Sequence, residues 1–321
     1  MRPQRLDGMN GLARTWAAPW LSAAIALGAV LSGCEPEQVE HKAEPRFVTR
    51  GIISATASRY VESGAPRPYE QFEMAAVFPR FKAEDERIVD SLLGERVPSA
   101  DLALDTCSQP IPVLNTRPRR RENGETAIEL LDVGDINVEF GEHKAAVPTR
   151  TFPDLLKVID GVIYSANESS SVTFEPGEVY TIEASGTDDI GAFGAGLEAP
   201  DELGEVKLDG IPIYEQMPVI RRGEDLEITW EGEGYGDEVI ATINWTNVGI
   251  SWSMSCRMKD DGRFSVPAEV TGLLLDPLVN NDHEMSLSRV RQVSFRSDGL
   301  RAGEFSFVVA TSFLVRFESS R

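Results

Sequence analysis

Apolar and polar residues alternate along much of the C-terminal third of the chain. From Val248 to Lys259, six apolar residues alternate strictly with six small or polar residues. Phe305 to Phe317 repeats the pattern, and shorter runs cover 226–230 and 239–245. A period of two is typical of a half-buried antiparallel strand. The run at 305–317 is so apolar that we expect it between two other strands, because an exposed edge there would invite aggregation.

Strand-like runs also fill the N-terminal half. Residues 48–61 and 72–78 predict a hairpin with a long loop. Two segments indicate short helices instead. Ala83–Leu93 has acids in its first turn, an apolar face and a following glycine, and Pro153–Ile159 begins with proline.

Two turn signals separate strand-like runs. Pro176-Gly177 suits the central positions of a type II turn, in which the second residue needs a positive φ. Asp260-Asp261-Gly262 is typical of a tight hairpin. We therefore predict a β-hairpin at each of these two places.

Many short strands, glycine and proline turns and two small helices predict a mainly β fold, built of antiparallel β-sandwich modules. Trp230 and Cys256 resemble the tryptophan and second cysteine of immunoglobulin-like domains, although the first cysteine of that pattern is missing. We therefore expect an Ig-like sandwich as an architecture, and not membership of the immunoglobulin family. The segments we expect are an N-terminal β-rich segment at 47–127, a sandwich module at 128–205 and a C-terminal Ig-like module at 206–321.

The N-terminus has a different pattern. Arginines precede an apolar stretch from Trp16 to Val30, which ends in Leu31-Ser32-Gly33-Cys34. This ending resembles the bacterial lipobox. The resemblance implies that residues 1–33 are a cleaved signal peptide, that Cys34 carries lipid, and that 34–46 is a flexible tether.

The resemblance to bacterial lipoproteins also bears on location. The residue after the cysteine is Glu35, and an Asp there resembles an inner-membrane retention signal. We therefore expect an outer-membrane lipoprotein of the cell envelope, on either face of that membrane. The rest of the chain resembles the β-rich envelope lipoproteins of Gram-negative bacteria in a general way that transfers no site residues.

The net charge of the chain limits the classes of partner that it can bind. The chain has 52 Asp and Glu against 31 Lys and Arg, a net charge of −21. Such an acidic surface argues against nucleic acid and against direct docking on anionic lipid. The membrane is expected as a partner through the lipid anchor alone, with an envelope protein or glycan as the other partner.

Cys107 and Cys256 remain after Cys34 is set aside. Disulfides persist outside the cytoplasm, so these two cysteines form either one long-range disulfide or two buried thiols. The sequence does not decide between the two states, because it cannot place the Cα atoms within bonding distance.

No catalytic motif stands out. The chain has three histidines: His41 lies in the tether, His143 in a polar stretch and His283 in a loop-like stretch, and we expect each at the surface. None has zinc-ligand spacing, and no nucleophile elbow or phosphate loop is present. We expect no cofactor, and the absence of these motifs favours a protein that is not an enzyme.

Calcium is the one metal for which the sequence offers candidates, because hard cations bind carboxylate and carbonyl oxygens of loops. The acidic loop residues that could supply ligands are Asp188, Asp189, Glu231, Glu233, Asp237, Asp260 and Asp261. None has EF-hand spacing, and simple exposed turns explain the same residues.

One basic cluster lies in this acidic chain, formed by Arg117, Arg119, Arg120 and Arg121. It indicates either an anion-binding patch, for example for phosphate on an envelope glycolipid, or a solvated loop that pairs with carboxylates.

Three functions agree with these observations. The first is a lipid-anchored envelope protein with a non-catalytic binding or structural role, which the absence of motifs favours. The second is an envelope carbohydrate hydrolase whose two acids meet only in the folded protein. The third is a calcium-stabilised adhesion module.

Overall fold

The computed structural model describes residues 47–62, 68–86, 89, 102–112, 128–152, 159–167, 172–233, 237–247, 250–274 and 283–319. Residues from Pro45 to Arg321 form one compact unit. The signal segment 1–33, Cys34 and the tether 34–46 lie outside the described residues, and their predictions stay predictions.

Among the described residues, thirteen strands form the largest sheet, which we call sheet A. Its main path is β2-β10-β6-β3-β1-β21-β20-β17-β18-β4, and β9, β15 and β5 pair with β10, β21 and β18. The strands are β1 (Phe47–Val61), β2 (Tyr69–Val77), β3 (Pro79–Lys82), β4 (Thr106–Cys107), β5 (Ile111–Pro112), β6 (Ile128–Leu130), β9 (Thr149–Phe152), β10 (Ile159–Asn167), β15 (Val219–Arg222), β17 (Glu238–Asn247), β18 (Ile250–Lys259), β20 (His283–Phe295) and β21 (Ala302–Ser319).

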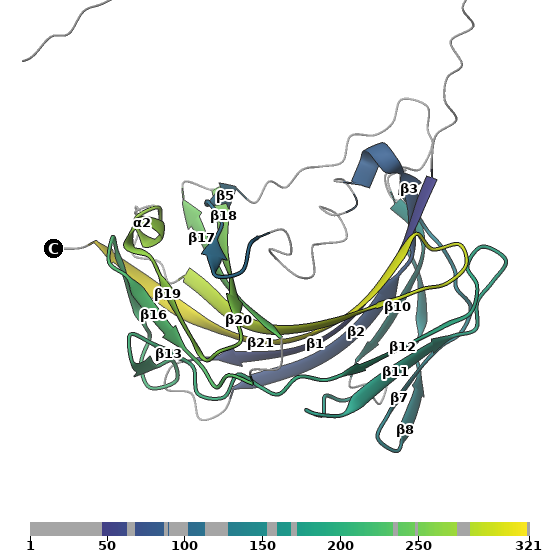
Figure 1. Ribbon diagram of the computed structural model, residues 1–321, viewed down its shortest axis with the longest axis horizontal. Helices are drawn as coiled ribbons and strands as arrows, with labels where there is room; N and C mark the ends of the chain where they lie inside the picture. The colour runs from purple at the N-terminus through teal and green to yellow at the C-terminus, as the bar shows by residue number, and fades with distance from the viewer. Residues whose placement is uncertain are drawn as a thin grey trace, which may run out of the picture. The chain divides into compact units, whose positions relative to one another are not determined.

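Two smaller sheets, each of four strands in the described part of the chain, pack against sheet A (Figure 1). Sheet B has the order β12-β11-β7-β8, with strands β7 (Ile136–Phe140), β8 (His143–Ala146), β11 (Val179–Ala184) and β12 (Phe193–Glu198). Sheet C has the order β14-β13-β16-β19, with strands β13 (Lys207–Leu208), β14 (Ile211–Pro212), β16 (Leu226–Thr229) and β19 (Arg263–Val266).

Helix is scarce in the described residues. The 3-10 helix η1 (Ala83–Asp85) stands where the first helix was predicted, and most of the residues that follow it up to Leu93 lie outside the description. Of the second predicted helix, only Ile159 is described, and it begins β10. The sequence analysis missed α2 (Ala268–Thr271), which directly follows Pro267. Proline at a helix start suits this position because its φ is already helical.

Three long strands run through the middle of sheet A. β21 pairs in parallel with β1 from Arg50↔Ala302 onward, and antiparallel with β20 along all of β20. The C-terminal strand therefore lies between two others, as predicted. The inward side chains of β21 are odd-numbered, so one strand face contributes to two successive cores.

The first core lies between sheet A and sheet B. Its β21 side chains are Phe305, Phe307 and Val309, and sheet B contributes Phe140 and Tyr180 among others. Phe140 and Tyr180 stack with ring centroids 4.9 Å apart. Aromatic rings fill much of this core because each buries a large apolar area.

The second core lies between sheet A and sheet C. Phe313, Val315 and Phe317 of β21 enter it, together with Met254 and Met258 of β18. The alternation seen in the sequence thus predicted the buried face of β18 correctly from Met254 to Met258, whereas Ile250, on the same face, is 48% exposed. The mainly β, sandwich-type fold class is likewise confirmed.

Of the predicted hairpins, that between residues 48–61 and 72–78 is confirmed, since β1 and β2 pair antiparallel. The one at Asp260-Asp261-Gly262 is wrong. The strand before it pairs with β17, whereas the strand after it pairs with β16 in sheet C. This turn is a corner between two sheets.

Pro176-Gly177 does form a turn, with φ of 77° at Gly177 and a bond from the Glu178 amide to the Glu175 carbonyl of 3.3 Å. The residues before it are not in a strand, so the predicted hairpin is wrong there too. Alternation identifies which face of a strand is buried, but it does not identify the neighbouring strand.

The expected division into three modules does not match the pairing. Strands from 47–127, 128–205 and 206–321 all enter sheet A, and the chain from Pro45 onward forms one compact unit. The boundaries at 127/128 and 205/206 therefore separate no independent bodies.

Candidate functional site

The inward-facing residues of β20 change character halfway along the strand. Met285 and Leu287 are buried in the second core, and Phe295 is buried in the first. Between them, at the same alternating positions, lie Arg289 and Arg291. A row of apolar side chains is thus interrupted by two cations where the two cores meet.

Arg289 is 0% exposed, and each of its three guanidinium nitrogens donates to at least one acceptor. Two of these bonds go to Asp260, from Nε at 2.7 Å and from Nη2 at 3.2 Å. Nη1 donates to the backbone carbonyls of Asp201 and Glu202, at 2.8 Å each, and Nη2 donates to the carbonyl of Glu231. Burial of a guanidinium is tolerated when it is paired and fully hydrogen-bonded in this way.

Arg291 makes a second set of bonds beside the first. It binds Asp237 with two parallel hydrogen bonds of 2.8 and 2.6 Å, the fork geometry that favours arginine. Its Nη2 also donates to Glu233 at 2.8 Å, and its Nη1 to the carbonyl of Glu198 at 3.2 Å. Glu233 joins the two sets, because its other oxygen accepts from Arg289 at 3.1 Å.

Apart from the Glu198 carbonyl of β12, the acceptors come from three of the connections by which the chain passes between sheets. Residues 199–206 lead from sheet B to sheet C, residues 230–237 from sheet C to sheet A, and the corner at Asp260 from sheet A to sheet C. Trp230 donates its indole N–H to Asp260 at 2.6 Å. The two arginines therefore supply donors to backbone carbonyls that no strand ladder satisfies. We call these residues the junction network: Trp230, Glu233, Asp237, Asp260, Arg289 and Arg291.

The surroundings shift the pKa of two groups of the network, Glu233 and Arg291. Burial raises the pKa of Glu233, against the opposing effects of the Asp201 amide and of both arginines. The hydrogen bond to Asp237 raises the pKa of Arg291. Three carboxylates face two guanidiniums, so proton uptake by Glu233 would bring the network close to neutrality.

The network contains a cluster of three carboxylates that lie close enough together to hold a metal ion. Oxygens of Glu233, Asp237 and Asp260 all lie within 4.8 Å of one another. Each of the three carboxylates is bonded to an arginine, and a cation would have to compete with those guanidiniums. The calcium prediction therefore stays a prediction, with three of its seven residues brought together.

The other predicted calcium ligands lie in different surroundings. Asp188 and Asp189 are exposed, and Asp189 forms an ion pair of 3.0 Å with Arg80. The side chains of Glu231 and Asp261 are exposed near the network. The sequence clusters at 231–238 and 260–261 thus meet in space, whereas 188–189 does not join the close carboxylate group.

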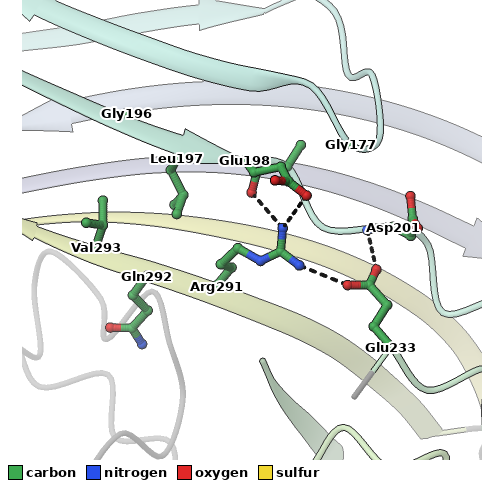
Figure 2. A pocket seen from close by; sticks show the side chains of 10 residues that line it. Gly177, Gly196, Leu197, Glu198, Asp201, Glu233, Arg291, Gln292 and Val293 are labelled. Carbon is green, nitrogen blue, oxygen red and sulfur yellow. Dashed lines mark hydrogen bonds and ion pairs between the residues drawn. The ribbon is translucent and has the colours of Figure 1, made fainter. Parts of the chain in front are cut away.

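A pocket of about 550 Å³ opens beside the network (Figure 2). Glu198 and Leu197 of β12 line one side, and Arg291 and Val293 of β20 line the other. Figure 2 shows Arg291 reaching across to Glu198 and Glu233, and the amide of Asp201 bonded to Glu233. The pocket is within the size range of small-ligand sites, but its charged groups are already bonded to one another.

Cys107 and Cys256 are joined by a disulfide in the structure. They face each other across the antiparallel pair of β4 and β18. Arg257 and Lys259, next along β18, hold the same segment through the Leu102 carbonyl and Asp105. Arg117, Arg119, Arg120 and Arg121 lie outside the described residues.

The two described histidines differ in exposure. His143 is exposed on β8, as expected, with its ring centroid 5.3 Å from that of Phe140. His283 was expected in a surface loop, and this was wrong. It is 4% exposed at the start of β20 and stacks on Phe317 at 4.5 Å. His41 lies outside the described residues.

The sequence pointed to five acids in or near the network, but not to the two arginines. The sequence does contain a pattern that could have identified the two arginines. Positions 285, 287, 293 and 295 are apolar with a period of two, and the same period places Arg289 and Arg291 on the buried face. A charged residue at an inward position predicts buried partners.

Comparison with known proteins adds little to this geometry. No protein-family profile and no curated protein sequence matches the chain. Among solved structures, the yeast delta-COP-I mu-homology domain is similar over 84% of this chain and 99% of that chain, with 10% identity and a TM-score of 0.21. A score this low carries no inference about fold or function. No helix in the described residues is long and apolar enough to cross a membrane.

Proposed function

We propose that this protein is a lipid-anchored component of the bacterial outer membrane whose folded body has a non-catalytic binding or structural role. The N-terminal pattern ending in Leu31-Ser32-Gly33-Cys34 supports the anchor. The net charge of −21 supports a body that stays off anionic lipid and nucleic acid.

The junction network is the observation that carries the non-catalytic role. A general acid or base must have a titratable group in reach of its substrate. Glu233 has the raised pKa that often marks such a group, yet it accepts bonds from Arg289, Arg291 and the Asp201 amide. Its bonds hold two inter-sheet connections against β20, and Arg289 holds the third through Asp260, which is a structural task.

Calcium-stabilised adhesion is the second candidate, and the approach of three carboxylates within 4.8 Å favours it. Thermal unfolding of the purified protein with calcium and with chelator separates the candidates. A bound ion would raise the melting temperature with calcium concentration by mass action. A melting temperature that chelator leaves unchanged supports the paired-arginine interpretation.

The anchor is tested with Cys34→Ser in the native host. The wild-type protein should sediment with membranes and release an N-terminal peptide that carries lipid on Cys34, as mass spectrometry measures. Cys34→Ser should be soluble. The double variant Cys107→Ser/Cys256→Ser is the control, because it loses two cysteines and keeps the anchor. Membrane association of Cys34→Ser would contradict the proposal.

A further inference from the structure

β12 is an edge strand of sheet B whose own sequence lacks the usual protection, and only the Glu198 carbonyl at its C-terminal end is bonded by Arg291 of β20 among the bonds described above. Natural proteins guard sheet edges with proline, lysine or a covering segment. Among the described edge strands, β5 contains Pro112, β14 contains Pro212 and β8 contains Lys144. β12 reads Phe-Gly-Ala-Gly-Leu-Glu, with no proline or basic residue.

The outward hydrogen-bonding groups of β12 belong to Gly194, Gly196 and Glu198, and the Glu198 carbonyl already accepts from Arg291. The Ser185 amide donates to the Asp135 carbonyl, so the odd-numbered residues of β11 face β7 and the even-numbered ones face β12. The Ala199 amide donates to the Glu178 carbonyl, which fits the same alternation. Gly194 and Gly196 therefore point their N–H and C=O groups away from β11, where the described sheet B has no further strand.

Packing does not require glycine at these two positions. A Cβ on Gly196 would meet its nearest atom, the Thr181 hydroxyl oxygen, at 3.6 Å, and one on Gly194 would meet the Ile182 carbonyl at 3.8 Å. Both are ordinary contacts. Glycine weakens a strand interior and often marks a place where another backbone approaches closely. Both glycines are exposed.

The space and the charge beside β12 indicate which kind of partner could bind at this edge. The pocket of about 550 Å³ lies between Gly196–Ala199 and residues 291–293 of β20, beside this edge (Figure 2). Residues 172–206, which include β11 and β12, contain nine Asp and Glu and no Lys or Arg. Four of these acids pair with basic residues: Asp189 with Arg80, Glu198 with Arg291, Glu202 with Arg59 and Glu205 with Lys207. A partner at this edge therefore meets the five other carboxylates of the segment.

We propose that the edge of β12 binds an extended, basic polypeptide segment of another protein, which adds to sheet B as a further strand. Backbone hydrogen bonds to Gly194 and Gly196 provide the pairing, and lysine or arginine side chains of the partner meet the acids around it. This inference rests on the proposed binding role and names its site and partner class.

The probe is a fluorescent decapeptide of alternating lysine and threonine, and the protein is the full mature chain purified in detergent. Fluorescence anisotropy measures its affinity. A second peptide of the same sequence carries N-methyl groups on two adjacent central residues, which block both of its edges without changing charge. It should bind about tenfold or more weakly, because each lost backbone bond costs roughly two- to tenfold. Equal affinities would overturn the proposal, because binding would then depend on charge alone.

Two variants test the same edge from the protein side. Gly196→Pro removes the outward N–H, and should weaken the lysine peptide about tenfold or more. Gly196→Ala is the matched control, which keeps the N–H and should bind within about twofold of wild type. If Gly196→Pro does not fold, as circular dichroism would show, the N-methylated peptide decides.

Sedimentation of the protein without peptide tests the other occupant of this edge. Self-association that Gly196→Pro abolishes would overturn the proposal in favour of a second copy of the chain. The anchoring test with Cys34→Ser has its own readout. Failure of peptide binding with a lipidated, membrane-bound protein would therefore reject the β12 site and leave the proposed anchoring intact.

Discussion

Replacement of Arg289 by methionine tests the junction network. Methionine fills a similar volume and donates no hydrogen bond. Asp260, whose side chain is 1% exposed, would keep the Trp230 indole N–H but lose its cationic partner. The carbonyls of Asp201, Glu202 and Glu231 would lose their donor at the same time.

The cost follows from these contacts. Removal of one partner of a buried ion pair destabilises a protein by about 3–5 kcal/mol, because the other charge stays buried. For a chain of this size, each kcal/mol lowers the melting temperature by about 2–4 °C. Arg289→Met should therefore melt on the order of 10 °C lower. Arg80→Met is the control, since Arg80 is 33% exposed and pairs with exposed acids, and it should cost about 1 kcal/mol or less.

Equilibrium unfolding in guanidinium chloride measures the difference in unfolding free energy. The double variant Arg289→Met/Asp260→Asn should recover part of the loss, because it removes the unpaired carboxylate charge. A loss no larger than that of Arg80→Met, or no recovery in the double variant, would refute the view that this network holds the sheets together.

Three further predictions concern single interactions. The Cys107→Ser/Cys256→Ser variant opens a loop of 149 residues and should lose up to about 5 kcal/mol of unfolding free energy, as denaturant titration measures; no loss would mean that the reduced chain is already restrained. Burial raises the pKa of Glu233 above 4.5, so its contribution is present below that pH and lost as pH rises through the raised pKa; the melting temperature of wild type relative to Glu233→Gln should fall from about pH 4 to pH 7, and a constant difference would contradict this. Tyr164 donates to Asp132 at 2.6 Å and accepts from the Val133 amide, so Tyr164→Phe should cost about 1–3 kcal/mol at neutral pH. The Tyr164 hydroxyl lowers the pKa of Asp132 below 3.8, so the part of this cost that comes from the charged pair should be lost as pH falls through that pKa; melting curves at neutral and acid pH test both statements.

Periodicity in the sequence predicted the strand faces well. Met254 and Met258 of β18 and Phe305 and Phe313 of β21 are buried as the alternation indicates. A period of two has this power because successive side chains must point to opposite sides of a sheet. The same signal predicted that β21 is internal, since so apolar a strand would invite aggregation at an exposed edge.

The periodicity did not predict which residues and strands contact one another in the folded protein. The turn at 260–262 has hairpin residues, yet it joins sheet A to sheet C, because which strands pair is decided by packing of the whole chain. Cys107 and Cys256 lie 149 positions apart, and only the fold places them on neighbouring strands. Arg289 and Arg291 occupy inward positions that the alternation marks, but their acceptors come from three distant connections.

Native-state hydrogen exchange tests most directly the central claim that the two cores belong to one compact unit, joined at the network, and unfold together. The slowest amides of β11 in the first core and of β17 in the second are followed by mass spectrometry at increasing denaturant. The account predicts that both sets exchange through the same global opening, with equal free energy and equal denaturant dependence. Opening of one core at a clearly lower free energy, with the other still protected, would contradict it.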